Sequence, residues 1–225
     1  TMVYGIARML NFAHGDIIMV GGFVIFTIVS TLGLPPMVGV LAAVIACTVL
    51  GVVIERVAYK PLRGPSSLAV LITAIGVSYL LQNVALLIFG SNARQFTSVV
   101  NVPSLKLAGG ALSISGVTMV TIITCIIIMA ALTTFINKTK VGQAMLAVSE
   151  DTGAATLMGI NVNSTIAITF AIGSALAAIA GALLCSAYPS LTPYTGSMPG
   201  IKAFVAAVFG GIGSIPGAFI GGLPF

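Results

Sequence analysis

Residues 117–136, VTMVTIITCIIIMAALTTFI, form an apolar run without a single charge. A helix needs about 20 consecutive apolar residues to cross the hydrocarbon core of a bilayer, and this run has that length. Apolar runs of about 10–14 residues are more typical of helices buried in soluble cores. The stretch therefore predicts a transmembrane helix.

The composition extends this prediction to the whole chain. Of the 225 residues, 58% are hydrophobic and only 6% are charged, whereas a soluble domain carries about 25% charged residues. So few charges cannot cover the surface of a soluble fold, which excludes that class. The net charge of +5 comes from basic residues scattered at the ends of apolar runs. That placement is typical of membrane topology signals, and we expect no nucleic-acid partner.

The predicted fold class is all-α: a polytopic transmembrane helical bundle in one domain, residues 1–225. Six spans are predicted, at residues 17–33, 37–54, 68–89, 117–136, 164–187 and 201–223. Residues 90–116 contain alternating apolar and polar positions, which predict short strands in an exposed loop. Pro216 predicts a kink or a break within the last span.

Two segments with basic residues predict the orientation. Residues 55–67 carry three basic side chains and one acid, and Lys138 and Lys140 directly follow the fourth span. Both segments lie on the same side of the membrane if the spans are counted as above. Basic residues concentrate in short cytoplasmic loops, so this side is predicted to be cytoplasmic.

The segment 138–160, KTKVGQAMLAVSEDTGAATLMGI, is neither apolar enough to span a membrane nor simply a loop. Its first half has apolar residues at helical spacing, which predict a short amphipathic helix: Val141, Met145 and Val148. Asp151 is predicted to cap a second helix, Thr152 to Met158, and Gly159 to end it in the left-handed conformation. Two interpretations remain open, a helical elbow that docks a soluble partner or a pair of solvated interfacial helices.

Six polar residues in or near the spans are candidates for lining a translocation path: Asn11, His14, Asp16, Ser78, Gln82 and Asn83. Ser78 and Gln82 are four residues apart and share one helix face. Polar groups at membrane depth usually face the interior of the bundle. Hydrogen bonding between helices is the simpler interpretation, and a water-filled path beside a helix broken at Gly15 is the other.

Neither an enzyme nor a bound cofactor is expected. His14 is the single histidine and has one nearby acid, which leaves too few ligands for a metal site. No nucleophile, base and acid come together along the sequence.

Four stretches resemble, in order, the bacterial branched-chain amino acid ABC importer permeases of the LivH type. They are TMVYGIARMLNFAHGD, VIERVAYKPLRG, VGQAMLAVSEDTGAATLMGINV and KAFVAAVFGGIGSIPGAFIGG. The resemblance implies a multi-pass subunit of the bacterial plasma (inner) membrane that hydrolyses nothing itself. It also implies a second related permease subunit, cytoplasmic ABC ATPase subunits and an extracytoplasmic substrate-binding protein as partners.

The resemblance further implies that the segment 138–160 is the coupling loop that docks into the ATPase. The residues implied are Gly142, Glu150, Asp151, Ala155 and Gly159. Permeases of this family begin before Thr1 and continue past Phe225, so the chain is expected to be a fragment that lacks both ends.

Two alternatives to branched-chain amino acid import stay open at this point. Urea and short-amide importers use closely similar permeases, so the substrate differs while the fold does not. A secondary transporter or channel that needs no ATPase is the other alternative, with Asp16 and His14 as its ionisable groups.

Overall fold

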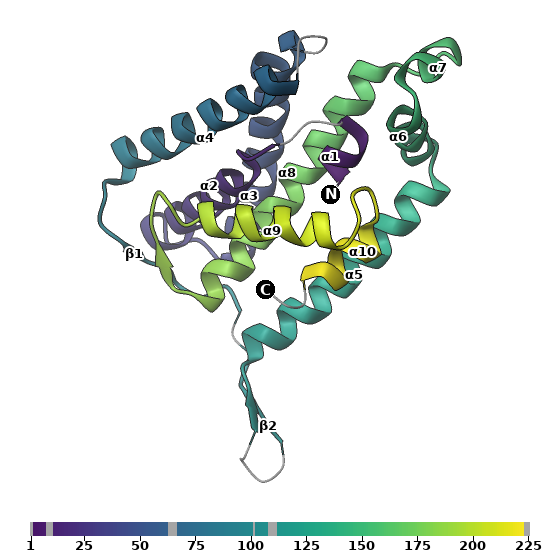
Figure 1. Cartoon of the computed structure of the whole chain (residues 1–225). Helices are drawn as coiled ribbons and strands as arrows, with labels where there is room; N and C mark the ends of the chain where they lie inside the picture. Colours follow the sequence, from purple (N-terminus) through teal and green to yellow (C-terminus); the bar gives the residue numbers. More distant parts are fainter. Residues whose placement is uncertain (1, 8–10, 63–66, 101, 108–111, 223–225) are drawn as a thin grey trace.

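The computed structural model describes residues 2–7, 11–62, 67–100, 102–107 and 112–222, and these form a helical bundle (Figure 1). This confirms the predicted all-α class. Its α-helices are α1 (Met2–Ala7), α2 (His14–Phe26), α3 (Pro36–Ile54), α4 (Ser67–Phe89), α5 (Gly116–Lys138), α6 (Lys140–Glu150), α7 (Thr152–Leu157), α8 (Val162–Ala187), α9 (Ser197–Phe209) and α10 (Ile215–Gly222).

Within the described residues, five helical stretches are long and apolar enough to cross a membrane. They are His14–Thr31, Pro36–Leu62, Leu68–Phe89, Gly116–Lys138 and Val162–Ala187. Each overlaps one of the first five predicted spans. The protein is therefore a multi-pass membrane protein.

Helical turns of other types continue the first two spans, and they make the second span longer than predicted. The π-helix η1 (Thr27–Thr31) extends α2. The π-helix η2 (Glu55–Tyr59) and the 3₁₀ turn η3 (Lys60–Leu62) extend α3. Residues 55–62 are therefore helical and not the start of a loop, since the buried side chains of Glu55 and Tyr59 continue the packed face of α3. Residues 63–66 of the predicted basic loop lie outside the described residues.

The predicted sixth span, 201–223, is two helices, and a single span there is wrong. Between α9 and α10 the chain turns through Gly211 and Gly213, whose φ angles are +87° and +93°. Glycine adopts such angles without steric cost. Pro216 falls in the first turn of α10, where its missing N–H is not needed. Residue 223 lies outside the described residues.

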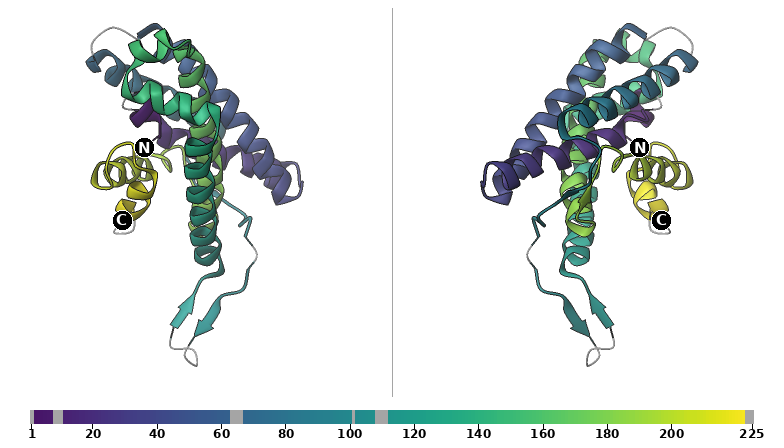
Figure 2. Two further views of the ribbon diagram at one scale, coloured as in Figure 1. Left: turned by 90° about the vertical axis from the view of Figure 1, so that its right-hand side faces the viewer. Right: turned by 90° about the vertical axis from the view of Figure 1, so that its left-hand side faces the viewer.

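Short strands form in the two loops opposite the elbow. Strands β2 (Leu105–Leu107) and β3 (Leu112–Ile114) pair antiparallel, as the alternation in residues 90–116 predicted. This ladder projects away from the helices (Figure 2). Strand β1 (Arg94–Gln95) pairs with β4 (Ser190–Leu191) and thereby ties the α4–α5 connection to the α8–α9 connection.

The core lies where α2, α3 and α8 pack against one another, and small residues allow this close approach. A Cβ at Gly181 of α8 would lie 2.6 Å from the carbonyl oxygen of Ile18, and one at Gly21 would lie 3.0 Å from the Cα of Ala178. Nearer the start of α8, a Cβ at Gly51 of α3 would overlap the side chain of Ser174. The three backbones are therefore as close as glycine permits.

The segments predicted to be cytoplasmic lie at one end of the bundle (Figure 1). Helices α6 and α7 lie at the same end as the beginning of α4, and the β2 strand lies at the opposite end. Helix α5 has no buried residue in its most apolar window, so its sides are available to lipid or to another membrane subunit.

Substitution of Gly181 by Val is expected to lower the free energy of unfolding by about 1–3 kcal/mol, the usual cost of overpacking. The added side chain meets the backbone of α2, which cannot move without disturbing α3. Thermal unfolding in detergent measures the effect, with Ala180→Val, at the exposed neighbouring position, as the control. Equal stability of the two variants would contradict the close α2–α8 contact.

Candidate functional site

Four polar side chains from three helices meet inside the bundle. This polar junction consists of Asp16 on α2, Ser78 and Gln82 on α4, and Ser197 on α9. The Asp16 side chain is 1% exposed. It accepts hydrogen bonds from Ser78 Oγ and, at 3.0 Å, from Gln82 Nε2. Gln82 Nε2 also lies 3.2 Å from Ser78 Oγ and 3.3 Å from Ser197 Oγ.

The local sequence explains why these groups converge. Asp16 lies in the first turn of α2, where a carboxylate is favoured by the helix dipole. Gly15, Gly196 and Gly200 let α9 approach this turn, since a Cβ at Gly15 would lie 2.3 Å from the Gly196 carbonyl oxygen. Gly15 therefore does not break the helix as predicted. Its missing side chain makes room for α9 instead.

The structure brings together three of the six predicted path residues, Asp16, Ser78 and Gln82, and places the other three elsewhere. Asn11 Oδ1 accepts a hydrogen bond of 2.8 Å from the Tyr59 hydroxyl. His14 is half-buried and faces Gly173 of α8. Asn83 is exposed and donates to the Tyr79 carbonyl oxygen of its own helix, so it does not belong to the polar junction.

Ser197 and Tyr59 are not among the residues that the sequence predicts for this region. Ser197 lies in the uncharged stretch 188–200, where Pro199 two residues later is a signal for a helix start. Tyr59 falls within the basic segment 55–67, which is predicted to lie on the cytoplasmic side. The structure buries its side chain completely.

The second candidate region is the elbow, defined here as α6, α7 and the residues up to Asn161. Thr139 caps α6 by accepting from Gly142 N at 3.0 Å, and it donates to the Phe135 carbonyl oxygen of α5 at 2.7 Å. A Cβ at Gly142 would lie 2.4 Å from the Ile136 backbone. The first turn of α6 is therefore fixed tightly against the end of α5.

The amphipathic character predicted for α6 is present, with one correction. Its buried residues are Gly142, Met145 and Val148, whereas Val141 is 39% exposed. Gly142 takes the position predicted for Val141 because only a residue without a side chain fits against α5 at that point.

The predicted cap of α7 is confirmed. Asp151 Oδ1 accepts from Gly153 N at 2.7 Å and from Ala154 N at 3.0 Å. Gly159 has a φ of +80° after the helix end, as predicted, and Ala155 is buried. Asn161 then caps α8 by accepting from Ser164 N at 3.1 Å. Because α6, α7 and α8 each begin with a side-chain cap, the elbow has a defined shape.

The tip of the elbow carries two apolar side chains in the open. Leu157 is 90% exposed and Met158 is 82% exposed, and they follow each other at the end of α7. The elbow lies at one end of the bundle, level with the beginning of α4 (Figure 1), and nothing in the described residues covers these two side chains. This exposed apolar pair is available for contact with a partner protein. The sequence does not predict this exposure, because apolar residues at the end of a short helix are equally compatible with burial.

The full chain, residues 1–225, matches the family described as the permease component of branched-chain amino acid transport systems. The chain belongs to this family. The high-affinity branched-chain amino acid transport system permease protein LivH of Salmonella typhimurium is 45% identical over 99% of this chain and 76% of the relative.

Two more distant relatives of this permease family extend the comparison. The Pseudomonas aeruginosa high-affinity branched-chain amino acid transport system permease protein BraD is 42% identical over 99% of this chain and 76% of its own length. The probable branched-chain amino acid transport permease protein LivH of Methanocaldococcus jannaschii is 29% identical over 99% and 71%. No solved structure matches the chain.

The polar junction is expected to show energetic coupling between Asp16 and Gln82. Alanine at either position breaks the same hydrogen bond, so the double variant Asp16→Ala/Gln82→Ala loses less stability than the sum of the single variants, by about 0.5–3 kcal/mol. Thermal unfolding of the four proteins measures this coupling. The pair Asp16→Ala and Asn83→Ala is the control and is expected to be additive. Additive losses for Asp16 and Gln82 would contradict the junction.

Proposed function

We propose that this chain forms part of the translocation path of an ATP-driven importer of branched-chain amino acids. A second related permease subunit completes the path, cytoplasmic ABC ATPase subunits drive it, and an extracytoplasmic binding protein delivers the amino acid. The observation that carries the proposal is the match of the whole chain to the permease family. The elbow also supports the proposal, since a permease driven by a separate ATPase subunit needs a surface on which that subunit can bind and move it.

The elbow suits this coupling role because it is fixed at both ends. Thr139 and Gly142 hold α6 against α5, and Asp151 and Asn161 cap the helices that follow. A displacement of the tip is therefore passed to α8, whose middle contacts α2 and α3. Coupling between two sites requires such an element with two alternative arrangements.

The polar junction is the proposed end point of this movement. Asp16 belongs to α2, while its donors belong to α4, so any shift of α2 relative to α4 opens the hydrogen bonds of Asp16. A freed carboxylate inside a membrane bundle attracts a cationic partner. The ammonium group of an amino acid supplies that charge, while the apolar walls of the bundle suit a branched aliphatic side chain.

The relatives favour branched-chain amino acids over the alternatives left open by the sequence. All three are named for branched-chain amino acid transport. Urea import is not favoured by any of these names. Membership in a family of transport-system components likewise argues against a channel that acts alone.

Substitution of Leu157 by Ala is expected to uncouple the permease from its ATPase. Leu157 is 90% exposed, so its truncation leaves no cavity and spares the fold, while removing an apolar contact at the tip. Co-purification with the ATPase subunits and ATP-dependent leucine uptake into vesicles should both fall by at least about tenfold, the loss typical of a residue that carries an interface.

The control for this experiment is Leu87→Ala, which truncates an equally exposed leucine (85%) on α4, away from the elbow. It should leave uptake unchanged. Equal uptake by Leu157→Ala and the unsubstituted protein would contradict the docking role of the tip. Uptake of urea, and not of leucine, by the unsubstituted system would contradict the proposed substrate while leaving the coupling intact.

Charge reversal at the elbow turn is expected to act differently at its two acids. Glu150 is exposed at the end of α6, so Glu150→Lys should reduce leucine uptake while changing the free energy of unfolding by no more than about 0.5 kcal/mol, as is usual at a surface. Asp151 is a helix cap, and Asp151→Ala should weaken α7 by about 1 kcal/mol. Asp151→Ser keeps a capping oxygen and should retain uptake. Loss of uptake in Asp151→Ser would mean that the Asp151 charge itself contacts the partner.

A further inference from the structure

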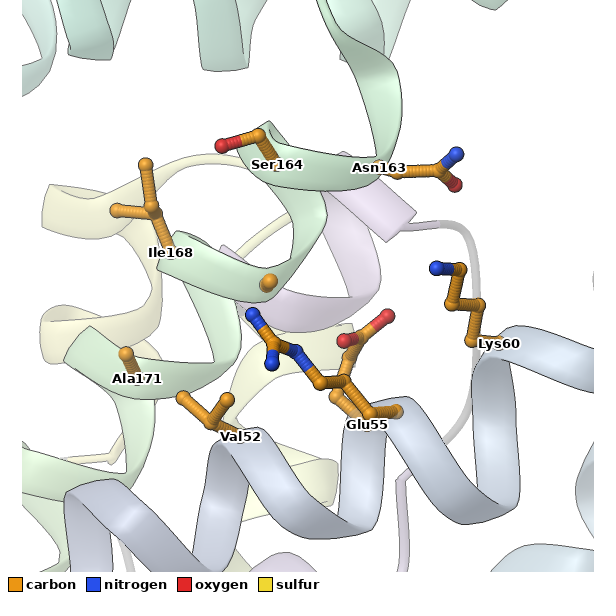
Figure 3. A pocket seen from close by; sticks show the side chains of 9 residues that line it. Val52, Glu55, Lys60, Asn163, Ser164, Ile168 and Ala171 are labelled. Carbon is orange, nitrogen blue, oxygen red and sulfur yellow. The ribbon is translucent and has the colours of Figure 1, made fainter.

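A pocket of about 440 Å³ opens between the end of α3 and the beginning of α8 (Figure 3). One wall comes from α3, η2 and η3, with Val52, Arg56 and Lys60, and the other comes from α8, with Asn163 and Ile168. It lies apart from the polar junction and the elbow tip, and neither of the roles proposed above uses it.

The depth of this pocket in the membrane follows from the length of α3. Arg56 comes 20 residues after Pro36, the first residue of the helix. At 1.5 Å per residue this is about 30 Å, the thickness of the hydrocarbon core. Arg56 and Lys60 therefore lie at the level of the lipid headgroups, on the side predicted to be cytoplasmic.

The lining changes from polar to apolar along the membrane normal. Lys60 and Asn163 lie at one end of the pocket, and Val52 and Ala171 lie at the other (Figure 3). Ala171 is eight residues beyond Asn163 on α8, which is about 12 Å deeper. A molecule that fills this pocket needs a polar part at the headgroup level and an apolar part below it.

The charge at the polar end favours an anion. Arg56 and Lys60 are both exposed, while the Glu55 side chain is 1% exposed and forms the inner wall. Two cations and one carboxylate leave a net charge of +1, with the positive groups nearer the opening. Basic pockets between transmembrane helices at the cytoplasmic face suit anionic headgroups.

We propose that this pocket binds an anionic phospholipid, with the phosphate headgroup between Arg56 and Lys60 and the upper part of an acyl chain along Val52 and Ile168. The site does not depend on the proposed coupling role, since it rests on the pocket's depth, polarity and charge. Free phosphate shares the headgroup chemistry but not the acyl chain, so the test must distinguish the two.

The test uses the absence of tryptophan from the sequence. A tryptophan at Ile168, 37% exposed on the pocket wall, becomes the sole indole of the chain. Ile168→Trp permease is reconstituted in equimolar vesicles of phosphatidylglycerol and phosphatidylcholine, with bromine on one lipid or the other as quencher. We expect phosphatidylglycerol to occupy the site about fivefold more often than phosphatidylcholine, because one net charge supplies a preference of this size. Excess inorganic phosphate should not displace it.

Two controls make the result decisive. Ile123→Trp on the exposed face of α5 should show no preference between the lipids. Arg56→Gln/Lys60→Gln should abolish the preference at Ile168→Trp, whereas Lys138→Gln/Lys140→Gln, which removes two charges from the same end of the molecule outside the pocket, should not.

Several outcomes would overturn the proposal. A specific phospholipid site is excluded by any of three results. They are equal quenching by both lipids, loss of the lipid preference in Lys138→Gln/Lys140→Gln, and displacement of the lipid by inorganic phosphate. Absence of quenching by either lipid would mean that protein covers the pocket, provided that a second reporter, Val53→Trp, agrees. Val53 is 48% exposed beside the lining residue Val52, so a reporter there does not fill the pocket.

Discussion

The close contact between α2 and α8 is the constraint on which the bundle depends. Within a membrane, apolar side chains gain little by leaving lipid for protein, so helices associate mainly through tight packing. Gly21 and Gly181 remove the side chains that would separate the two backbones. Helix α3 then packs on α8 through Gly51, and α9 packs on the start of α2 through Gly15. Helices α3, α8 and α9 are thereby packed together at glycine contacts.

Burial of Asp16 is a consequence of that packing. Once α9 and α4 close around the first turn of α2, the carboxylate has no access to water and must find donors within the protein. Ser78 and Gln82 provide them from one face of α4. Burial of the carboxylate costs little free energy while the helices stay together and its donors are in place. When the helices separate, the carboxylate loses these donors and can bind a ligand. This property makes the junction a suitable place for a gate in the proposed transport cycle.

The elbow and the pocket both lie at the predicted cytoplasmic end, and α8 connects them. Its capped start follows the elbow directly, its first turns line the pocket, and its middle contacts α2 and α3. A phospholipid between α3 and α8 would therefore occupy the space through which the proposed movement passes. The lipid surroundings and the ATPase would act on the same helix.

The sequence by itself determined the membrane class, five of the apolar helices, the cap of α7 and the left-handed Gly159. These features depend on local composition or on hydrogen bonds within a few residues, so a short window contains their cause. Pro216 predicted a kink or a break in the last segment, but not the glycine turn that divides it into α9 and α10. Only the tertiary structure decided that Ser197 joins Asp16, that Asn83 stands apart, that Tyr59 is buried and that Leu157 and Met158 are exposed. Those outcomes depend on which helix faces meet between distant parts of the chain, as for Gln82 and Ser197, which are more than 100 residues apart. The chain is also apolar almost throughout, so the pattern of side chains does not distinguish the face toward protein from the face toward lipid.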